Sequence, residues 1–195
     1  MNRYDPELTL RDARAQYFAV NDFGWGGYDD KWVKVEYGRL RFCFPNTKGR
    51  VKVVKYHDLH HILTEYGTSL SGETEIGAWE VATGCTSNLA AWVLNLSAFA
   101  WGLVINPKGV YKAFLRGRQS ANLYHVPFDD ELLSANIGVL RRRLKLDEPL
   151  RPATFSDNAV FIFWSLVSVA TLLVIVGIVF TPLIAVLICG WWLFG

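Results

Sequence analysis

Residues 51–73 read VKVVKYHDLHHILTEYGTSLSGE, and this stretch decides the expected fold. Apolar and polar positions recur at helical spacing up to about residue 65. The Gly- and Ser-rich run at 67–72 then interrupts the helix, and a second helix is expected from Glu73 to about residue 83. Histidines and acids stand on this helix–turn–helix unit, so the fold and the chemistry are predicted to lie together.

The spacing of the first polar side chains predicts that they converge. On a helix each residue advances by about 100°, which places His61 near 40° and Asp58 near 100° if His57 is taken as zero. These three side chains can therefore reach one ion. His60 points well away, near 300° on the same scale, and is the weaker candidate for a ligand.

Acids beyond the first helix extend this cluster. The turn at 67–72 allows the chain to double back, so Glu73 can supply a fourth ligand from the start of the next helix. Glu80 lies on nearly the same face as Glu73, and we expect it to support the ligands or to act as a general base. Glu65 is a reserve ligand, and His125 is expected to be structural.

Two imidazoles and two carboxylates make a site of intermediate hardness. Zn²⁺ fits this ligand set best, and Fe²⁺ or Mn²⁺ would also fit. With only three or four protein ligands, a position remains open for water or substrate.

The rest of residues 1–157 predicts a compact all-α domain with one short β-hairpin. A charge-free helix at 89–105 is either a buried core helix or a surface that dips into a membrane. Alternation at every second position predicts the hairpin at 32–44. Helical spacing is also expected at 1–20, 110–118 and 129–145.

The C-terminal tail, residues 158–195, contains no Lys, Arg, Asp, Glu or His. Its stretch 159–180 reads AVFIFWSLVSVATLLVIVGIVF, which is long enough for a transmembrane helix of about 20 residues. The whole tail as one straight helix would be about 57 Å long, nearly twice the thickness of the hydrocarbon core. We therefore expect either one transmembrane helix or a helical hairpin that turns near Pro182.

Charges and cysteines predict where the domain lies. Basic residues at 141–151 precede the tail, so the positive-inside rule predicts that the domain faces the cytoplasm. Three well-separated cysteines with no CxxC pair argue against a disulfide framework. The net charge of +2 gives no reason to expect a nucleic-acid partner.

The sequence resembles the coenzyme Q biosynthesis protein 4 family. The shared signature is HDxxH, eleven residues and E, which this chain carries as His57-Asp58-x-x-His61-x11-Glu73. Gly72, Trp79, Glu80, Thr83-Gly84 and the segment LRRRL at 140–144 are also similar. Residues 20–50 and the apolar tail depart from the family pattern, which indicates a divergent bacterial member.

The resemblance implies an all-helical, membrane-associated protein of ubiquinone biosynthesis. It assigns metal binding to His57, Asp58, His61 and Glu73, and it implies oxidative decarboxylation at ring carbon one of a prenylated hydroxybenzoate. Other quinone-biosynthesis proteins and a second copy of the chain are the implied protein partners.

Three functions compete at this stage. The first is a metalloenzyme acting on a prenylated aromatic lipid, in which Glu80 moves a proton. The second is a non-catalytic organiser that presents lipid or other enzymes at the membrane and holds a structural metal. The third is a membrane-tethered hydrolase of an unrelated lipid.

Overall fold

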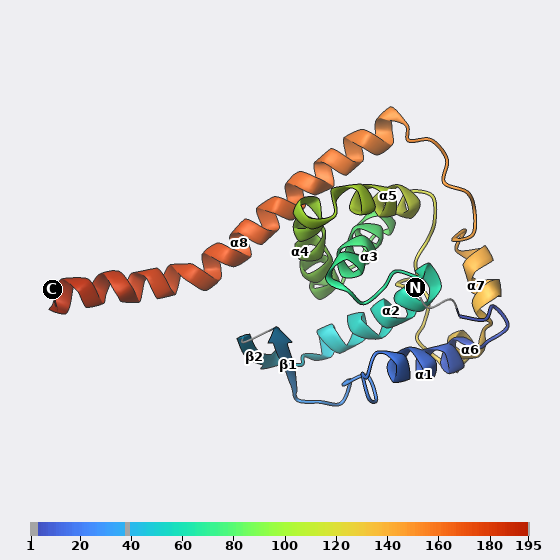
Figure 1. The fold of residues 1–195 in the computed structure, drawn as a ribbon, viewed down its shortest axis with the longest axis horizontal. Helices are drawn as coiled ribbons and strands as arrows, with labels where there is room; N and C mark the ends of the chain where they lie inside the picture. Colours follow the sequence, from blue (N-terminus) through green and yellow to red (C-terminus); the bar gives the residue numbers. More distant parts are fainter. Residues whose placement is uncertain (1–3, 38–39, 195) are drawn as a thin grey trace.

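The computed structural model describes residues 4–37 and 40–194, with side chains at all of these positions except 34–37, 40, 42, 44 and 182–194. The described chain is mostly helical, as predicted (Figure 1). Its elements are α1 (Leu10–Val20), β1 (Trp32–Tyr37), β2 (Leu40–Pro45), α2 (Lys48–Thr64), α3 (Leu70–Thr83), α4 (Leu89–Ile105), α5 (Pro107–Gly117), α6 (Asp130–Ser134), α7 (Ile137–Arg143) and α8 (Phe155–Phe194). Strands β1 and β2 pair antiparallel, which confirms the hairpin.

Side-chain caps define the helix–turn–helix unit. Helix α2 begins after Thr47, whose hydroxyl accepts a hydrogen bond from the Arg50 amide, and it ends at Glu65 in the left-handed conformation, with a φ of 65°. The hydroxyl of Ser69 accepts from the amide of Gly72 and caps α3. Because of this cap, α3 begins earlier than predicted, and Glu73 lies in its first turn.

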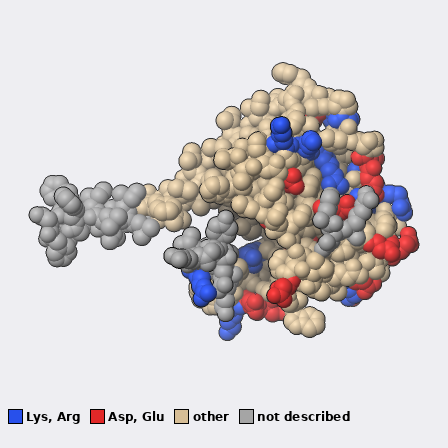
Figure 2. Space-filling view, in the orientation of Figure 1, with Lys and Arg blue, Asp and Glu red and all other residues tan. Residues whose placement is uncertain are grey.

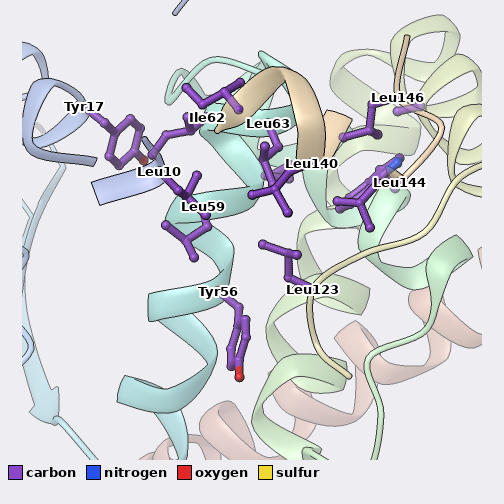
Figure 3. Packing of buried hydrophobic residues seen from close by; sticks show 14 of the residues in the cluster. Leu10, Tyr17, Tyr56, Leu59, Ile62, Leu63, Leu123, Leu140, Leu144 and Leu146 are labelled. Carbon is purple, nitrogen blue, oxygen red and sulfur yellow. The ribbon is translucent and has the colours of Figure 1, made fainter. Parts of the chain in front are cut away.

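Apolar side chains from both ends of the domain pack on α2. Leu59, Ile62 and Leu63 are almost completely buried on one side of this helix. Figure 3 shows them against Leu10 and Tyr17 of α1 and against leucines of the segment after residue 120. This core fixes the orientation of α2, and with it the direction in which the histidines point.

Small residues bring α3 and α4 close together. A Cβ atom on Gly77 of α3 would lie 2.8 Å from the Cβ of Ala98 and 3.2 Å from the carbonyl oxygen of Asn95. On α4, a Cβ on Gly102 would lie 2.7 Å from the Cβ of Thr74. Such close packing excludes any side chain at either glycine. It also places Asn95 of α4 beside Glu80 of α3.

The single helix predicted for 129–145 is wrong, because the chain is extended between α6 and α7. The amide of Leu10 donates to the carbonyl of Ala135 at 2.9 Å, and the amide of Ile137 donates to the carbonyl of Leu8 at 3.0 Å. This short pairing with the N-terminal segment takes backbone groups that a continuous helix would need for itself.

Of the two alternatives for the tail, the structure has one continuous helix and no hairpin. Proline removes one intrahelical hydrogen bond, but the residues around Pro182 include no Gly or Asn that would support a reversal of the chain. Residues Phe155–Thr181 form a helix that is long and apolar enough to cross a membrane. Beyond α4 this helix projects away from the domain (Figure 1).

The first part of α8 is not a free tether, because it packs along α4. The indole rings of Trp92 and Trp164 stack with centroids 4.9 Å apart. Phe161 contacts Phe99 of α4 and Phe114 of α5, with centroid distances of 5.7 and 5.3 Å. The helix therefore starts as part of the domain and leaves it only later.

Candidate metal centre

Three side chains from α2 and α3 converge at the open end of the helix–turn–helix unit. The Nε2 atoms of His57 and His61 are 3.1 Å apart. The Glu73 carboxylate lies 3.2 Å from each, with Oε2 towards His57 and Oε1 towards His61. In the part of the chain that the structure describes, this is the group of His, Cys, Asp and Glu residues that could hold a metal ion.

The hydrogen bonds of the two rings leave their Nε2 atoms suited to bind a metal. His61 Nδ1 lies 3.0 Å from the carbonyl oxygen of Tyr66, which can only accept, so Nδ1 carries a hydrogen. His57 Nδ1 donates in the same way to Glu80 Oε1 at 3.0 Å. A metal-binding histidine commonly donates its other ring N–H to a carboxylate or a carbonyl group, and both residues have this arrangement.

The spacing of these donors fits a tetrahedral ion. Metal–ligand distances of about 2.0–2.1 Å to nitrogen and oxygen give edges of about 3.3–3.4 Å between neighbouring donors. The three separations of 3.1–3.2 Å are close to this value. The Glu73 side chain is 39% exposed, so solvent reaches this end of the triangle. The three residues therefore offer a donor set that fits a divalent metal ion.

Asp58 follows His57 but stands outside this triangle. It is buried, and its Oδ2 accepts a hydrogen bond of 2.6 Å from the hydroxyl of Tyr28. Burial raises the pKa of Asp58, although the Tyr28 hydrogen bond acts in the opposite direction. The structure thus brings together His57, His61 and Glu73 and leaves the predicted ligand Asp58 bound to a tyrosine.

Glu80 is the centre of a buried polar network behind the triangle. The Glu80 side chain is fully buried, and its Oε1 accepts from His57 Nδ1 and from His60 Nδ1 at 2.7 Å. Its Oε2 accepts from the amide of Asn95 and, at 2.5 Å, from the hydroxyl of Tyr124. In this arrangement the Glu80 carboxylate holds the His57 ring in place, and whether Glu80 also acts as a general base stays a prediction.

His60 belongs to this network and cannot also bind the ion. Its Nδ1 donates to Glu80, and its Nε2 accepts from the backbone amide of Leu123 at 3.0 Å. Both ring nitrogens are used, so no lone pair is free. Burial lowers the pKa of His60 and keeps the ring neutral. The sequence-based view that His60 points away from the ligands is consistent with this position.

The histidines and the two glutamates shift each other's pKa. Burial opposes protonation of His57, but Glu80 and Glu73 outweigh it, so the pKa of His57 is raised well above its usual value. Burial would raise the pKa of Glu73, but hydrogen bonds with His57 and His61 lower it to about 2. Burial acts in the same sense on Glu80, whose pKa is nevertheless well below normal because of His57 and His60. Both carboxylates are therefore anionic and attract a cation.

A cavity of about 300 Å³ adjoins the triangle on the side of His61. Its wall includes Tyr17, Tyr66 and the turn between α2 and α3. The ring of Tyr17 stacks on the His61 imidazole, with centroids 5.7 Å apart and planes 20° from parallel. Aromatic faces and a candidate metal therefore border the same space, which is at the lower end of the volume range of small-molecule sites.

The two remaining candidates lie apart from the ligands. Glu65 contacts the cavity but forms an ion pair with Arg141 at 3.2 Å. His125 is exposed on the segment between α5 and α6. Neither belongs to the group that could bind an ion.

Sequence reasoning missed Tyr28, Tyr124 and Asn95. The first two come from loops whose docking follows no local pattern. Asn95 had a usable signal, because it is the one amide side chain in the charge-free run at 89–105. A polar side chain at such a position requires a buried partner, and here the partner is Glu80.

No protein-family model matches the chain, and no curated protein or solved structure matches it either. The likeness to the coenzyme Q biosynthesis protein 4 family therefore stays a prediction from the motif. Fold, metal-binding geometry and a membrane-length helix are the properties on which a functional proposal can be built.

Proposed function

We propose that this chain is a membrane-anchored metalloprotein of the ubiquinone-biosynthesis type, which acts on a prenylated hydroxybenzoate. The observation that carries the proposal is the triangle of His57, His61 and Glu73, spaced at 3.1–3.2 Å beside an aromatic cavity. The same residues form the motif HDxxH-x11-E. Zinc is the ion that we propose, since two imidazoles and a carboxylate suit it.

The setting of the site supports a lipid substrate. A helix long enough to cross a membrane leaves the same domain, and a prenylated aromatic is a membrane-resident molecule. The aromatic head would occupy the cavity, where Tyr17 and Tyr66 offer ring faces. We place the protein at the inner membrane of a bacterium, with the domain in the cytoplasm.

The proposed reaction replaces the ring carboxylate by a hydroxyl group. The bond between ring carbon one and the carboxylate breaks and CO₂ leaves, while a new carbon–oxygen bond forms with oxygen from water. The change removes two electrons and requires dioxygen as the acceptor, so that carboxylic acid, water and O₂ give phenol, CO₂ and hydrogen peroxide. A bound divalent metal would supply Lewis acidity to polarise the substrate carboxylate.

The residues of the chain have separate tasks in this proposal. His57, His61 and Glu73 hold the ion and leave one corner for the substrate. Glu80 keeps the His57 ring oriented through its 3.0 Å hydrogen bond. Because Glu80 is fully buried behind the ligands, it positions His57 and does not touch the substrate. This is a narrower role than the general base predicted from sequence.

A non-catalytic organiser is the second candidate, and one observation favours it. The network around Glu80 ties α2, α3 and α4 together through His57, His60 and Asn95. A metal that completes this network would stabilise the domain whatever the domain binds. In that case the domain, alone or as a dimer with a second copy of the chain, would present a lipid to other quinone-biosynthesis proteins.

A lipid profile of a deletion strain tests the proposal. The strain is complemented with wild type, His61→Ala or the exposed control His125→Ala. We expect wild type and the control to restore quinone, and His61→Ala to accumulate a carboxylated prenyl-phenol while remaining folded in the membrane. Restoration by His61→Ala would refute a metal-dependent reaction and favour the organiser. A profile unaffected by the deletion would refute the pathway assignment.

A further inference from the structure

Helix α4 exposes an apolar face that no described element covers. Trp101 and Val104 are 56% and 80% exposed, and Leu94 and Ile105 are also on the surface. These residues recur at helical spacing along one side, and the opposite side packs on α3. Exposed large side chains in such a contiguous stripe mark an interaction surface.

The face continues onto the first part of α8. Ile162, Phe163 and Leu166 are all more than half exposed, and α8 runs beside α4 through the stacked indoles of Trp92 and Trp164. Neither α4 nor residues 158–181 contain a charged side chain. In Figure 2 the described part of α8 that leaves the domain is tan, and the blue and red atoms lie over the rest of the domain.

Two hydroxyl groups along this surface, those of Ser97 and Ser165, are bonded within their own helices. Ser97 donates to the carbonyl of Val93 at 2.7 Å, and Ser165 donates to the carbonyl of Phe161 at 2.8 Å. Side chains that face hydrocarbon have no water to bond with, so this internal bonding is what such an environment requires. A bilayer is therefore a better match than a polar protein partner.

Helix α4 is arranged to lie along a membrane and not across it. It spans 17 residues, or about 25 Å, which is shorter than the hydrocarbon core of about 30 Å. Lysines stand near both of its ends. Exposed Lys108 follows its C-terminal end, and exposed Lys48 adjoins Gly49, whose carbonyl oxygen lies 3.4 Å from the side-chain amide of Asn88. A crossing helix of this length would leave at least one of these ends inside the hydrocarbon, below the headgroups.

Helix α8 then has two parts. Half-buried or buried side chains recur at helical spacing as far as residues 171 and 172, and Ser168 is completely buried. From 173 to 181 only Ile175 is half-buried and the other side chains are exposed. Residues 172–194 remain, about 35 Å of helix, which is sufficient to cross the hydrocarbon core without the first part.

We infer that the outward faces of α4 and of residues 158–171 form one surface that is embedded in the interfacial layer of the bilayer, and that only the later part of α8 crosses. The domain then contacts the membrane directly along α4, and α8 is not its only attachment to the bilayer. This inference rests on the membrane anchoring in the proposed function, but not on the metal or on any reaction.

Depth-dependent fluorescence quenching tests the inference on the full chain. In a Cys43→Ser, Cys189→Ser background, single cysteines replace Trp101, Leu166, Leu173 or Val139 and are labelled with nitrobenzoxadiazole. Cys85 can stay, because it is buried and its pKa is raised to about 12 by that burial. The protein is placed in vesicles of phosphatidylcholine and phosphatidylglycerol, with doxyl quenchers either near the headgroup or near the end of the acyl chain.

The inference predicts a different response at each position. Labels at 101 and 166 lose emission mainly to the shallow quencher, and the label at 173 loses more to the deep quencher. The label at Val139, exposed on α7, is unaffected by either and serves as the control. All four sites are exposed, so the substitutions leave the core intact.

Three outcomes would overturn it. If the label at 101 is not quenched while that at 173 is, the domain hangs from a tether. If the label at 101 responds mainly to the deep quencher, α4 crosses the membrane. If it is not quenched and cysteines at 101 cross-link two copies, the face is a protein–protein interface. None of these results would change the outcome of the lipid-profile test, which examines the proposed reaction separately.

Discussion

Replacing Glu80 by glutamine disturbs the network behind the metal triangle with almost no change in volume. In the wild type, each carboxylate oxygen accepts two hydrogen bonds. The new amide nitrogen must stand at one of the two oxygen positions. It then faces either the ring N–H groups of His57 and His60 or the donors of Asn95 and Tyr124.

The size of the effect follows from these lost bonds. A hydrogen bond to a charged group contributes about 1.5–3 kcal/mol, and two of them lose their acceptor. Removing one partner of a buried ionic network costs about 3–5 kcal/mol. For a chain of this length, that loss lowers the melting temperature by roughly 6–20 °C. Zinc binding should weaken by about 10–100-fold, because His57 is no longer held by a carboxylate.

The assay combines thermal unfolding in detergent micelles with zinc titration against a chromophoric chelator. Glu75→Gln is the matched control on the same helix. Glu75 accepts a single bond of 2.9 Å from Asn106, and glutamine keeps an oxygen for it, so a change of about 1 kcal/mol at most is expected. If Glu80→Gln melts and binds zinc like the wild type, the assignment of Glu80 as the support of His57 is refuted.

Three further predictions concern the triangle and its scaffold. Zinc affinity should rise about tenfold per pH unit between about pH 6 and pH 8 for each proton displaced. The reason is that zinc must replace the Nε2 proton, which the raised pKa of His57 favours. The metal-free protein should instead lose stability as pH rises through that pKa. A zinc affinity that does not change with pH over this range would contradict the replacement of a proton by zinc. Glu73→Gln should abolish tight zinc binding, whereas Asp58→Asn, which alters a side chain bound to a tyrosine hydroxyl, should weaken it less; the reverse order in the same titration would make Asp58 the primary ligand. Gly102→Ala should destabilise the domain by about 1–3 kcal/mol, because its Cβ would lie 2.3 Å from a methyl group of Val110. The control Gly177→Ala, in a helix and with open space around it, should not lower the melting temperature.

Local patterns predicted the parts of the site that lie on one helix or across one turn. The angle between His57 and His61 follows from helical geometry alone, and the turn at 67–72 brings Glu73 back to them. The β-hairpin and the membrane-length helix could also be predicted, because period-two alternation and a charge-free apolar run are strong signals. These features need no knowledge of how distant segments pack.

Features that depend on contacts between distant segments could not be predicted from local sequence patterns. Tyr28 reaches Asp58 from a loop thirty residues away in the chain, and this contact separates Asp58 from the other motif residues. The break between α6 and α7 depends on pairing with the N-terminal segment at Leu8 and Leu10, which helical spacing cannot reveal. The sequence of the tail also left open whether it forms one helix or a hairpin at Pro182, and the structure has the continuous helix.

The zinc stoichiometry of the purified full chain tests the central claim most directly. Wild type, His61→Ala and His125→Ala are each loaded with zinc, dialysed against buffer and measured by elemental analysis. The triangle predicts one bound zinc for the wild type and for His125→Ala, and none for His61→Ala, with all three equally helical by circular dichroism. Equal zinc content in all three proteins would contradict a metal site built on His57, His61 and Glu73.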